Sequence, residues 1–434
     1  MGETSTQRLQ SLLMSSARVT AAEIGIAQAR LSSIIAPTPL QYVPRLSELT
    51  GAQVYVKRED LQSVRSYKIR GAYNSIAQLT EEERAAGVVT ASAGNHAQGV
   101  AFACRSLGIT GRIYVPVQTP KQKLDRIRVH GGDHIDIKLV GHSFDEASEA
   151  AHQDAADTGA TMIEPFDARN TVVGQGTVAA EILAQLTAEG KRLDTIFVPV
   201  GGGGLLGGIL SYLGDMSPAS HVVGVEPRSA ASMQAALAAG GPVTLDSVDP
   251  FIDGTAVKRV GELTYQIAAD AGERLSMSVI DEGAVCSELL ALYQNEGIIA
   301  ETAGALSVAG LRAQDVTPDS VVVCVISGGN NDVLRYAEIV ERDLIYRGLK
   351  HYFLVDFPQE PGQLRHFLTD ILGPDDDISR FEYVKRNNRD YGTALVGIEL
   401  ADAANLAPLI ARMDASPLEI TQLQPGTPEY EFLF

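Results

Sequence analysis

The glycine-rich segment Thr195–Gly208 reads TIFVPVGGGGLLGG. Its first part, Thr195–Val200, is a short apolar run without polar alternation, which predicts a strand buried on both faces. Four successive glycines then let the backbone curl so that several N–H groups point at one anion, with a helix start behind them. A tight turn rarely needs four glycines in a row, so we favour a phosphate site over a purely structural turn. The residues of this glycine turn are Gly201, Gly202, Gly203, Gly204 and Leu205.

Outward from this turn, short apolar runs alternate with helical periodicity from about Gln53 to Asp343. The further expected strands are Val54–Val56, Val88–Thr90, Arg112–Val117, Ile135–Val140, His221–Val225 and Val321–Ile326. The expected helices include Phe144–Asp157, Gly176–Leu186 and Ser229–Ala238. Repeated βα winding of this kind predicts the α/β class, with one open parallel sheet or two.

The glycine turn also permits a competing interpretation. Gly202, Gly204 and Gly207 fit the dinucleotide pattern G-x-G-x-x-G. Glu226 ends the next expected strand about 20 residues further on, where a ribose-binding acid belongs. A nicotinamide-dependent dehydrogenase is therefore an alternative, but it leaves Lys68 and the polar turn Ser92–Gly99 without a role.

Lys68 lies in the segment Ser66–Asn74, SYKIRGAYN, at the expected buried start of an amphipathic helix. Burial and the positive end of the helix dipole both lower the pKa of a lysine there and leave an amine that can form a Schiff base. Most lysines at helix starts are solvated or paired with a carboxylate. The catalytic interpretation of Lys68 therefore depends on agreement with other segments.

A polar turn, Ala91–Gly99 (ASAGNHAQG), joins the strand Val88–Thr90 to an expected helix Val100–Leu107. The backbone N–H groups of such a strand-to-helix turn suit a carboxylate. Asn95 could also donate a hydrogen bond to a ring hydroxyl or imine. An ordinary capping turn, in which Asn95 and His96 satisfy backbone groups, explains the segment equally well.

Ser327 leaves the end of the strand Val321–Ile326 in the turn SGGNND. A hydroxyl there can hydrogen-bond a pyridine nitrogen without giving it a full proton, which suits β-elimination better than transamination. A turn in which Ser327 caps a helix is the structural alternative. All four segments follow expected strands at their carboxyl ends, where ligands collect in open sheets. A lysine, a carboxylate turn, a phosphate turn and a ring-nitrogen serine together indicate a pyridoxal 5'-phosphate site.

Charge and composition exclude several classes of partner. A net charge of -19 and a pI of about 4.8 argue against nucleic-acid and anionic-membrane partners, which need clustered basic charge. No apolar run approaches the roughly 20 residues of a membrane helix, and the N-terminus lacks the regions of a signal peptide, so we expect a cytoplasmic protein. Cys104, Cys286 and Cys324 lie in apolar patterns without C-x-x-C spacing, so we expect buried structural thiols.

Composition changes near Arg347, after which the expected elements follow the βαββαβ order of a ferredoxin-like module. These elements are Lys350–Phe357, Pro361–Ile371, Ile378–Arg386, Thr393–Leu400, Asp402–Met413 and Leu418–Gln422. The module carries no candidate catalytic cluster. We therefore expect it to regulate or assemble the enzyme.

The sequence resembles the biosynthetic threonine dehydratases (threonine ammonia-lyases), which are fold-type II pyridoxal phosphate enzymes. Besides the four segments, the resemblance rests on Pro37–Leu40 (PTPL), Lys57–Asp60 (KRED) and the C-terminal module, and it spans nearly the whole chain. It implies a two-lobed parallel-sheet core like that of tryptophan synthase β, followed by one ACT-like regulatory domain. The catalytic domain would be residues 1–343, with a smaller lobe at about 61–160, and the regulatory domain residues 344–434.

The resemblance also implies a role for each site residue. Lys68 would hold the cofactor and act as the catalytic base, and the glycine turn would bind the cofactor phosphate. Asn95 would contact the ring oxygen and Ser327 the ring nitrogen. Ser92, Asn95 and His96 would bind the substrate carboxylate.

Two departures from related families refine the expectation. Serine racemases of this fold carry a second acid/base serine where this chain has Ala93, so protonation from the opposite face is not expected. Racemase-like relatives also bind a divalent metal through an acid and a later Asp. Here Glu226 matches the first place but Ser232 stands at the later one, so no metal is expected.

The implied reaction converts L-threonine to 2-oxobutanoate and ammonia, the first committed step of isoleucine biosynthesis, with L-serine as a secondary substrate. The resemblance further implies isoleucine as an inhibitor acting at the C-terminal domain, and a homotetramer. Two other classes stay open. One is the dehydrogenase described above, and the other is a non-catalytic amino-acid sensor that would need only the C-terminal module.

Overall fold

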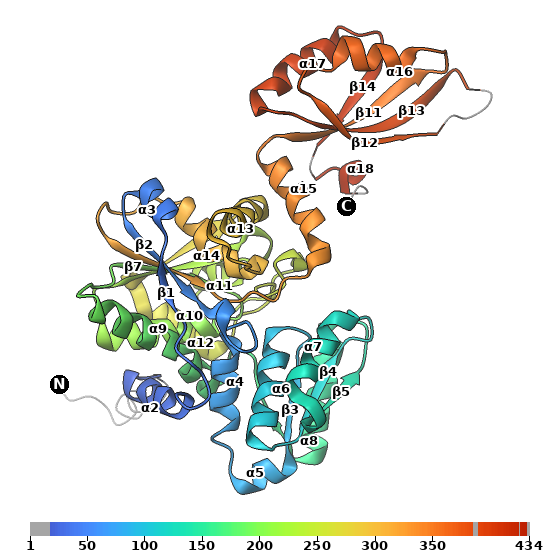
Figure 1. Cartoon of the computed structure of the whole chain (residues 1–434). Coiled ribbons are helices and arrows are strands. Elements are labelled where there is room, and N and C mark those ends of the chain that lie inside the picture. The colour runs from blue at the N-terminus through green and yellow to red at the C-terminus, as the bar shows by residue number, and fades with distance from the viewer. Residues whose placement is uncertain (1–17, 385–388, 425, 432–434) are drawn as a thin grey trace, which may run out of the picture. The chain divides into compact units, whose positions relative to one another are not determined.

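The computed structural model describes residues 18–384, 389–424 and 426–431, and Figure 1 labels their elements. The chain divides into two compact units, Met1–Asp332 and Val333–Phe434. The helix α15 (Tyr336–Tyr346) therefore belongs to the second unit, whereas the sequence analysis placed the boundary after Asp343.

The larger sheet of the first unit has six strands in the order β1-β2-β10-β7-β8-β9. These strands are β1 (Leu40–Tyr42), β2 (Gln53–Arg58), β7 (Thr195–Pro199), β8 (His221–Pro227), β9 (Leu275–Ile280) and β10 (Val321–Ile326). Neighbouring strands are parallel except for β1, which is antiparallel to β2 at the edge. β10 lies inside the sheet and all of its residues are buried, which explains its unbroken apolar sequence.

Helices surround this larger sheet. They are α2 (Ala21–Leu31), α3 (Pro44–Thr50), α9 (Arg169–Ala188), α10 (Gly204–Met216), α11 (Ser232–Ala239), α12 (Glu262–Ala271), α13 (Glu282–Glu296) and α14 (Thr302–Arg312). Ile196, Val198, Val323 and Val325 share one core with side chains of α9 and α10. α14 also packs against β7 and β10.

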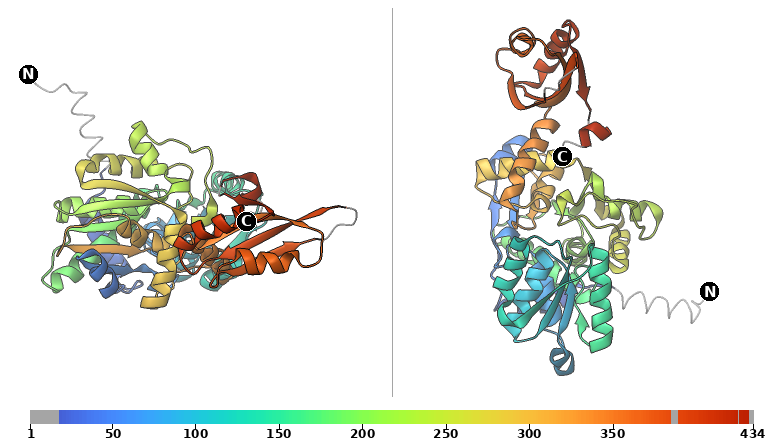
Figure 2. Two further views of the ribbon diagram at one scale, coloured as in Figure 1. Left: turned by 90° about the horizontal axis from the view of Figure 1, so that it is seen from above. Right: turned by 90° about the vertical axis from the view of Figure 1, so that its right-hand side faces the viewer.

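The smaller sheet has four parallel strands in the order β5-β4-β3-β6. These are β3 (Val88–Ala91), β4 (Gly111–Val115), β5 (Ile135–Leu139) and β6 (Thr161–Met162). The helices of this lobe are α4 (Lys68–Ile76), α5 (Glu81–Ala86), α6 (Asn95–Leu107), α7 (Lys121–Gly131) and α8 (Phe144–Thr158). α6 and α7 share a core with β4, whereas α8 packs with β3, so that helices lie on both faces of the sheet (Figure 2).

Several elements differ from the sequence expectation. β1, β6 and β9 were not expected, and α9 begins at Arg169 rather than at Gly176. α11 begins at Ser232, after a short 3-10 turn, rather than at Ser229. α6 begins at Asn95, five residues before the expected start at Val100. Asn, His and Gly are weak helix formers, so the sequence favoured a turn where tertiary packing extends the helix.

The second unit confirms the βαββαβ order. Its antiparallel sheet has the order β12-β13-β11-β14. The elements are β11 (Lys350–Pro358), α16 (Gln363–His366) with a π-helical turn (Phe367–Ile371), β12 (Asp377–Tyr383), β13 (Tyr391–Glu399), α17 (Leu406–Asp414), β14 (Glu419–Leu423) and α18 (Pro428–Glu431). The core of this unit includes Phe353, Phe367, Val396 and Leu409. Lys385 and Arg386, the end of one expected strand, lie outside the described residues.

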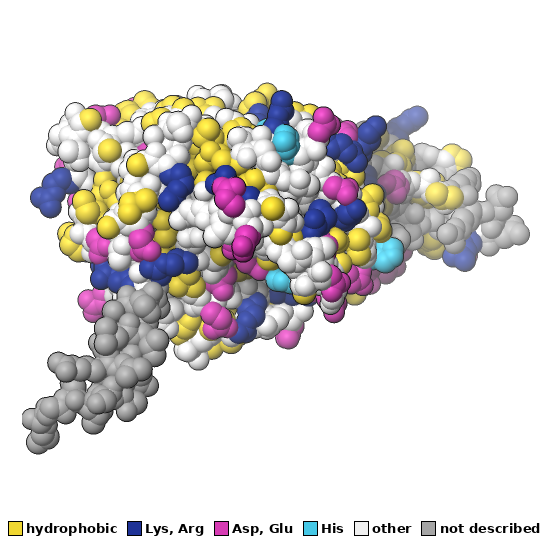
Figure 3. Space-filling model, turned by 90° about the horizontal axis from the view of Figure 1, so that it is seen from below, with side chains coloured by type: hydrophobic (Ala, Val, Ile, Leu, Met, Phe, Trp, Pro, Cys, Tyr) yellow, Lys and Arg dark blue, Asp and Glu magenta, His cyan; other side chains and the backbone are white. Residues whose placement is uncertain are grey.

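Surface and burial agree with the composition. No helix in the described ranges is long and apolar enough to cross a membrane. Acidic side chains lie among basic ones on the face shown in Figure 3. Cys104, Cys286 and Cys324 are buried, as expected.

Candidate functional site

Lys68 is the first residue of α4, where the sequence analysis placed it. Its Nζ donates a hydrogen bond of 2.8 Å to the carbonyl of Pro165. Burial lowers the pKa of Lys68 to about 8, although the nearby Glu301 carboxylate opposes the shift. At pH 8 about half of such amines are neutral, against about 0.3% for an ordinary lysine. Lys68 can therefore act as a nucleophile and base near neutral pH.

The short segment between β6 and α9 joins Lys68 to the glycine turn, and the sequence analysis did not identify it. Pro165 accepts the Lys68 hydrogen bond, and the next residue, Phe166, packs on the turn. A Cβ at Gly202 would lie 2.2 Å from the Phe166 ring, and one at Gly204 would lie 3.0 Å from the Phe166 Cα. The lysine amine and the glycine turn are thus brought together by two consecutive residues.

The glycine turn follows β7 and leads directly into α10. Gly203 has φ 92°, a left-handed conformation that favours glycine. The Gly202 carbonyl accepts a hydrogen bond of 2.7 Å from Thr264 Oγ1, which anchors the turn on α12. The first N–H groups of a helix have no acceptor within it, so those of Gly203, Gly204 and Leu205 are available to an anion.

Ser327 lies beside the lysine segment. The Tyr67 N–H donates to the Ser327 carbonyl at 3.0 Å, and Ser66 forms an antiparallel bridge with Gly328. The Ser327 hydroxyl donates a long hydrogen bond of 3.3 Å to the carbonyl of Ala303. The buried Ser66 hydroxyl has no hydrogen-bond partner among the described residues, so it is available to hydrogen-bond a ligand at this end of the site.

Asn95 begins α6 and is held from two sides. Its Nδ2 donates to Glu301 Oε1 at 2.7 Å, and Asn330 Nδ2 donates to its Oδ1 at 2.7 Å. Burial, with a further contribution from Asp253, raises the pKa of Glu301 to about 7. Like Pro165 and Phe166, Glu301 was not identified as a candidate site residue from the sequence. A lone carboxylate in the apolar stretch IAETAG (299–304) was the available signal.

His96 and Ser92 complete the polar turn. His96 Nε2 lies 2.8 Å from the Ile163 carbonyl, and its Nδ1 is buried without a partner in the part of the chain that is described. Burial and the Lys68 charge lower the pKa of His96 to about 3, so the ring is neutral at physiological pH. The Ser92 hydroxyl accepts the Gly94 N–H at 3.2 Å and shapes the turn.

Glu226 does not serve the glycine turn. Its two carboxylate oxygens accept the N–H groups of Met233 and Gln234, at 2.7 and 2.9 Å, at the start of α11. The dinucleotide interpretation therefore lacks its ribose-binding acid. Within the described ranges, no group of three or more His, Cys, Asp or Glu side chains is arranged to hold a metal ion.

These residues fit pyridoxal phosphate. Lys68 offers an amine of lowered pKa for the cofactor aldehyde. The glycine turn, which a Cβ would obstruct, offers N–H groups for the phosphate. The Ser66 hydroxyl and His96 Nδ1 are buried polar atoms still without a partner among the residues described. Such atoms are costly to leave unpaired, so a polar ligand in this site is favourable.

Comparison with known families gives two matches. Residues 31–328 match the model of the family described as pyridoxal-phosphate dependent enzyme. Residues 341–433 match the model described as the C-terminal regulatory domain of threonine dehydratase.

Curated relatives and solved structures agree with these matches. The chain is 69% identical to "L-threonine dehydratase biosynthetic IlvA" of Corynebacterium glutamicum, over 96% of this chain and 95% of that protein. It is 46% identical to the Bacillus subtilis protein of the same description, over 96% and 97%. Threonine deaminase isoform 2 from Solanum lycopersicum, in its processed form, superposes with a TM-score of 0.69 at 35% identity, over 79% of this chain and 94% of that one. Maize serine racemase superposes with a TM-score of 0.69 at 29% identity, over 76% and 98%.

Proposed function

Because the chain belongs to the pyridoxal-phosphate dependent enzymes, and within them to the biosynthetic L-threonine dehydratases, we propose that it converts L-threonine to 2-oxobutanoate and ammonia. L-Serine is proposed as a secondary substrate. The main support for the proposal is the Lys68 amine, which has a lowered pKa and donates a hydrogen bond to the carbonyl of Pro165. The next residue, Phe166, packs on the glycine turn.

The site residues take the following proposed roles. Lys68 would hold the cofactor, and the N–H groups of the glycine turn would bind its phosphate. Ser327, beside the lysine segment, would hydrogen-bond the ring nitrogen. Asn95 would contact the ring oxygen, and its two hydrogen bonds to Glu301 and Asn330 support a fixed orientation for its amide.

Pyridoxal phosphate, when bound, supplies the electron sink for negative charge at the substrate α-carbon. The chain supplies the proton transfer. The Lys68 amine removes the α-proton, since a pKa of about 8 makes it a base matched to neutral pH. The substrate carboxylate is proposed to bind the turn of Ser92, Asn95 and His96, where the N-terminus of α6 favours negative charge.

Racemisation is the alternative reaction for this fold. It needs a second acid/base group on the opposite face of the substrate, and this chain has Ala93 where serine racemases carry that serine. An alanine cannot donate a proton, which supports elimination. Chiral analysis of the amino acid recovered from the assay below should therefore detect no D-isomer above background.

The test is an assay of the purified protein with pyridoxal phosphate and L-threonine, with 2-oxobutanoate and ammonia measured together. Wild type should form both products, and Lys68→Ala should abolish turnover because base and cofactor attachment are lost together. Lys138→Ala, which changes a partly exposed lysine of β5, is the matched control and should keep wild-type activity. Wild-type turnover by Lys68→Ala would contradict the assignment.

The second unit contains the regulatory domain. We propose isoleucine as its feedback inhibitor, tested by threonine saturation curves with and without L-isoleucine. Unchanged curves would contradict this effector. A homotetramer and a cytoplasmic location stay predictions, the former testable by light scattering.

A further inference from the structure

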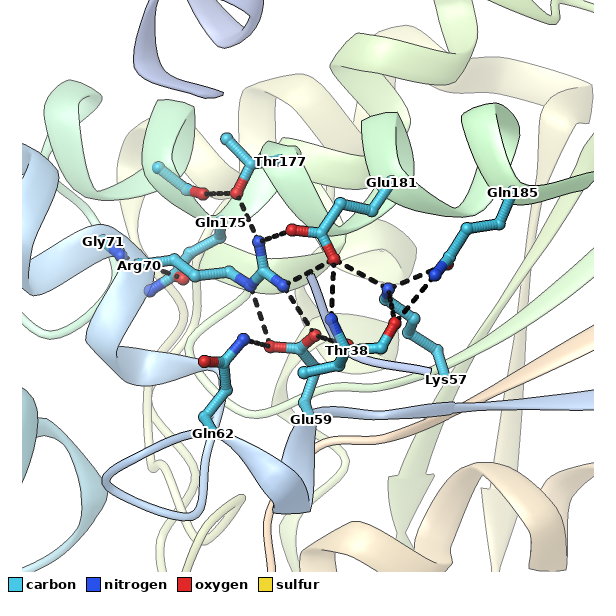
Figure 4. A network of polar contacts seen from close by, with 11 residues as sticks. Thr38, Lys57, Glu59, Gln62, Arg70, Gly71, Gln175, Thr177, Glu181 and Gln185 are labelled. Carbon is cyan, nitrogen blue, oxygen red and sulfur yellow. Dashed lines mark hydrogen bonds and ion pairs between the residues drawn. The ribbon is translucent and has the colours of Figure 1, made fainter. Parts of the chain in front are cut away.

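We infer that the buried ion-pair network around Arg70 sets the distance between Lys68 and the glycine turn, and that the network acts through α9. α9 carries none of the residues assigned to the site. Arg70 and Glu181 are therefore positioning residues, and Figure 4 shows the network that they share. This inference rests on the proposed roles of Lys68 and the glycine turn.

Arg70 follows Lys68 by two residues on α4, and every donor of its buried guanidinium is used. Nε and Nη2 form a fork with the Glu59 carboxylate, at 2.8 Å each. Nη1 and Nη2 form a second fork with the Glu181 carboxylate, at 2.7 and 2.9 Å, and Nη1 also reaches Thr177 Oγ1 at 3.1 Å. Planar forks of this kind fix direction as well as distance. α4 is therefore locked to α9, which carries Thr177 and Glu181.

Lys57 extends the network and balances its charge. Its Nζ donates to Glu181, to the Thr38 carbonyl and to Gln185, at 2.7, 2.8 and 3.0 Å. Two cations thus face two carboxylates, and Lys57, Glu59 and Arg70 are almost fully buried. A buried ion pair of this kind adds little net stability, but removal of one partner is strongly destabilising because it leaves an unpaired charge. The network therefore serves geometry more than stability.

Glycines bring α9 into backbone contact with both neighbouring helices. A Cβ at Gly174 would lie 2.7 Å from the Arg70 carbonyl oxygen on α4. A Cβ at Gly208 of α10 would lie 2.4 Å from the Gly176 nitrogen of α9. The Gly71 N–H also donates to Gln175 Oε1 at 3.2 Å. Lys68 begins α4 and the glycine turn begins α10, so α9 between them fixes how far apart the two lie.

This spacing matters because the cofactor is proposed to be held at two points. A ligand gains from a second contact only when both contacts can form together without strain. If the distance between Lys68 and the glycine turn changes, we expect the protein to lose the part of its cofactor affinity that comes from the phosphate. The Lys68 amine should still react as in wild type.

The experiment compares two ligands on the apoprotein: pyridoxal phosphate, and pyridoxal, which lacks the phosphate. The first readout is the ratio given by the dissociation constant of pyridoxal divided by that of pyridoxal phosphate, both measured by absorbance. The second readout is the rate at which pyridoxal reacts with the apoprotein at fixed pH. Arg70→Lys keeps the charge and removes the forks, so we expect the ratio to fall at least about tenfold with an unchanged pyridoxal rate. An unchanged ratio, or an equal loss for both ligands, overturns the inference.

The matched control is Arg45→Lys, since Arg45 of α3 also pairs with two carboxylates, Glu288 and Glu296, away from α4 and α9. It should leave the ratio at the wild-type value. If Arg70→Lys does not fold, Thr177→Val removes one Arg70 bond and keeps all four charges. We expect it to lower the ratio less, and a wild-type ratio overturns the inference.

Failure of the underlying site gives a different result. If wild type binds both ligands equally, the phosphate role of the glycine turn fails. If Lys68→Ala still reacts with pyridoxal at the wild-type rate, the Lys68 assignment fails. Both outcomes are read without Arg70→Lys, so they are distinct from failure of the positioning role.

Discussion

Lys68 and Glu301 both titrate near neutral pH because burial penalises charge. The pKa of Lys68 falls to about 8 and that of Glu301 rises to about 7. Above about pH 7 the Glu301 carboxylate is ionised, and its charge keeps the pKa of Lys68 from falling further. Glu301 also holds Asn95 through a hydrogen bond, so it affects both the amine and the residue proposed to contact the ring oxygen.

Glu301→Gln should therefore lower the pKa of Lys68 below that of wild type. The neutral amine is the reactive form, so the rate at which the apoprotein reacts with pyridoxal should reach half its maximum at a lower pH. A pH–rate profile measures this midpoint. Glu82→Gln, at an exposed position of α5, should leave it unchanged. A midpoint that stays in place or rises in Glu301→Gln is incompatible with this account.

Residues with local signals could be predicted from the sequence, and residues defined by long-range contacts could not. Lys68, the glycine turn and Ser327 each follow a recognisable strand-to-turn pattern. In contrast, the hydrogen-bonded residues Asn95 and Glu301 are 206 residues apart in the sequence. Lys68 and Pro165 are 97 residues apart, and Arg70 and Glu181 are 111 residues apart. Such partners depend on how the two sheets come together, which no local window contains.

At the scale of elements, the buried strands β7 and β10 match their predicted bounds closely, whereas the long helices α6 and α9 begin earlier than predicted and the shortest strands were missed. β6 has two residues and β1 three, so neither shows a period. β9 (LSMSVI) alternates serine with apolar residues, but the sequence analysis did not assign it. The start of α6 was missed because Gly99 packs on α4, where a Cβ would lie 3.1 Å from the Lys68 carbonyl oxygen. That contact favours a helix through Asn95, His96 and Gly99, whose helix propensity is low.

The glycine turn gives a prediction at this scale. Gly203→Ala places a Cβ at positive φ, 2.8 Å from Met233 Cε, so we expect a loss of roughly 1–2 kcal/mol in stability together with weaker binding of pyridoxal phosphate. Denaturant unfolding and an absorbance titration measure the two effects. Gly190→Ala, also at positive φ but in open space, should show a similar backbone cost and bind the cofactor normally. Equal cofactor affinity in both variants would count against the turn as the phosphate site.

For the whole molecule, the division into two units has thermodynamic consequences. The second unit has its own core, built only from residues of that unit. Two units that each have their own hydrophobic core are expected to unfold in two separate transitions. The sequence predicted this organisation from the change in composition near Arg347.

Calorimetry of the full chain should therefore resolve two thermal transitions. Pyridoxal phosphate should raise the midpoint of one, and L-isoleucine that of the other, since a ligand stabilises the unit that binds it. L-Leucine serves as the control amino acid. If isoleucine shifts only the cofactor-sensitive transition, its proposed binding to the second unit is wrong.

The proposed attachment of pyridoxal phosphate to Lys68 can be tested by borohydride reduction of the cofactor-loaded protein, followed by peptide mass spectrometry to locate the pyridoxyl group. We predict stoichiometric modification of Lys68 alone, with loss of the modification in Lys68→Ala. A pyridoxyl group on any other lysine, with Lys68 unmodified, would contradict the account.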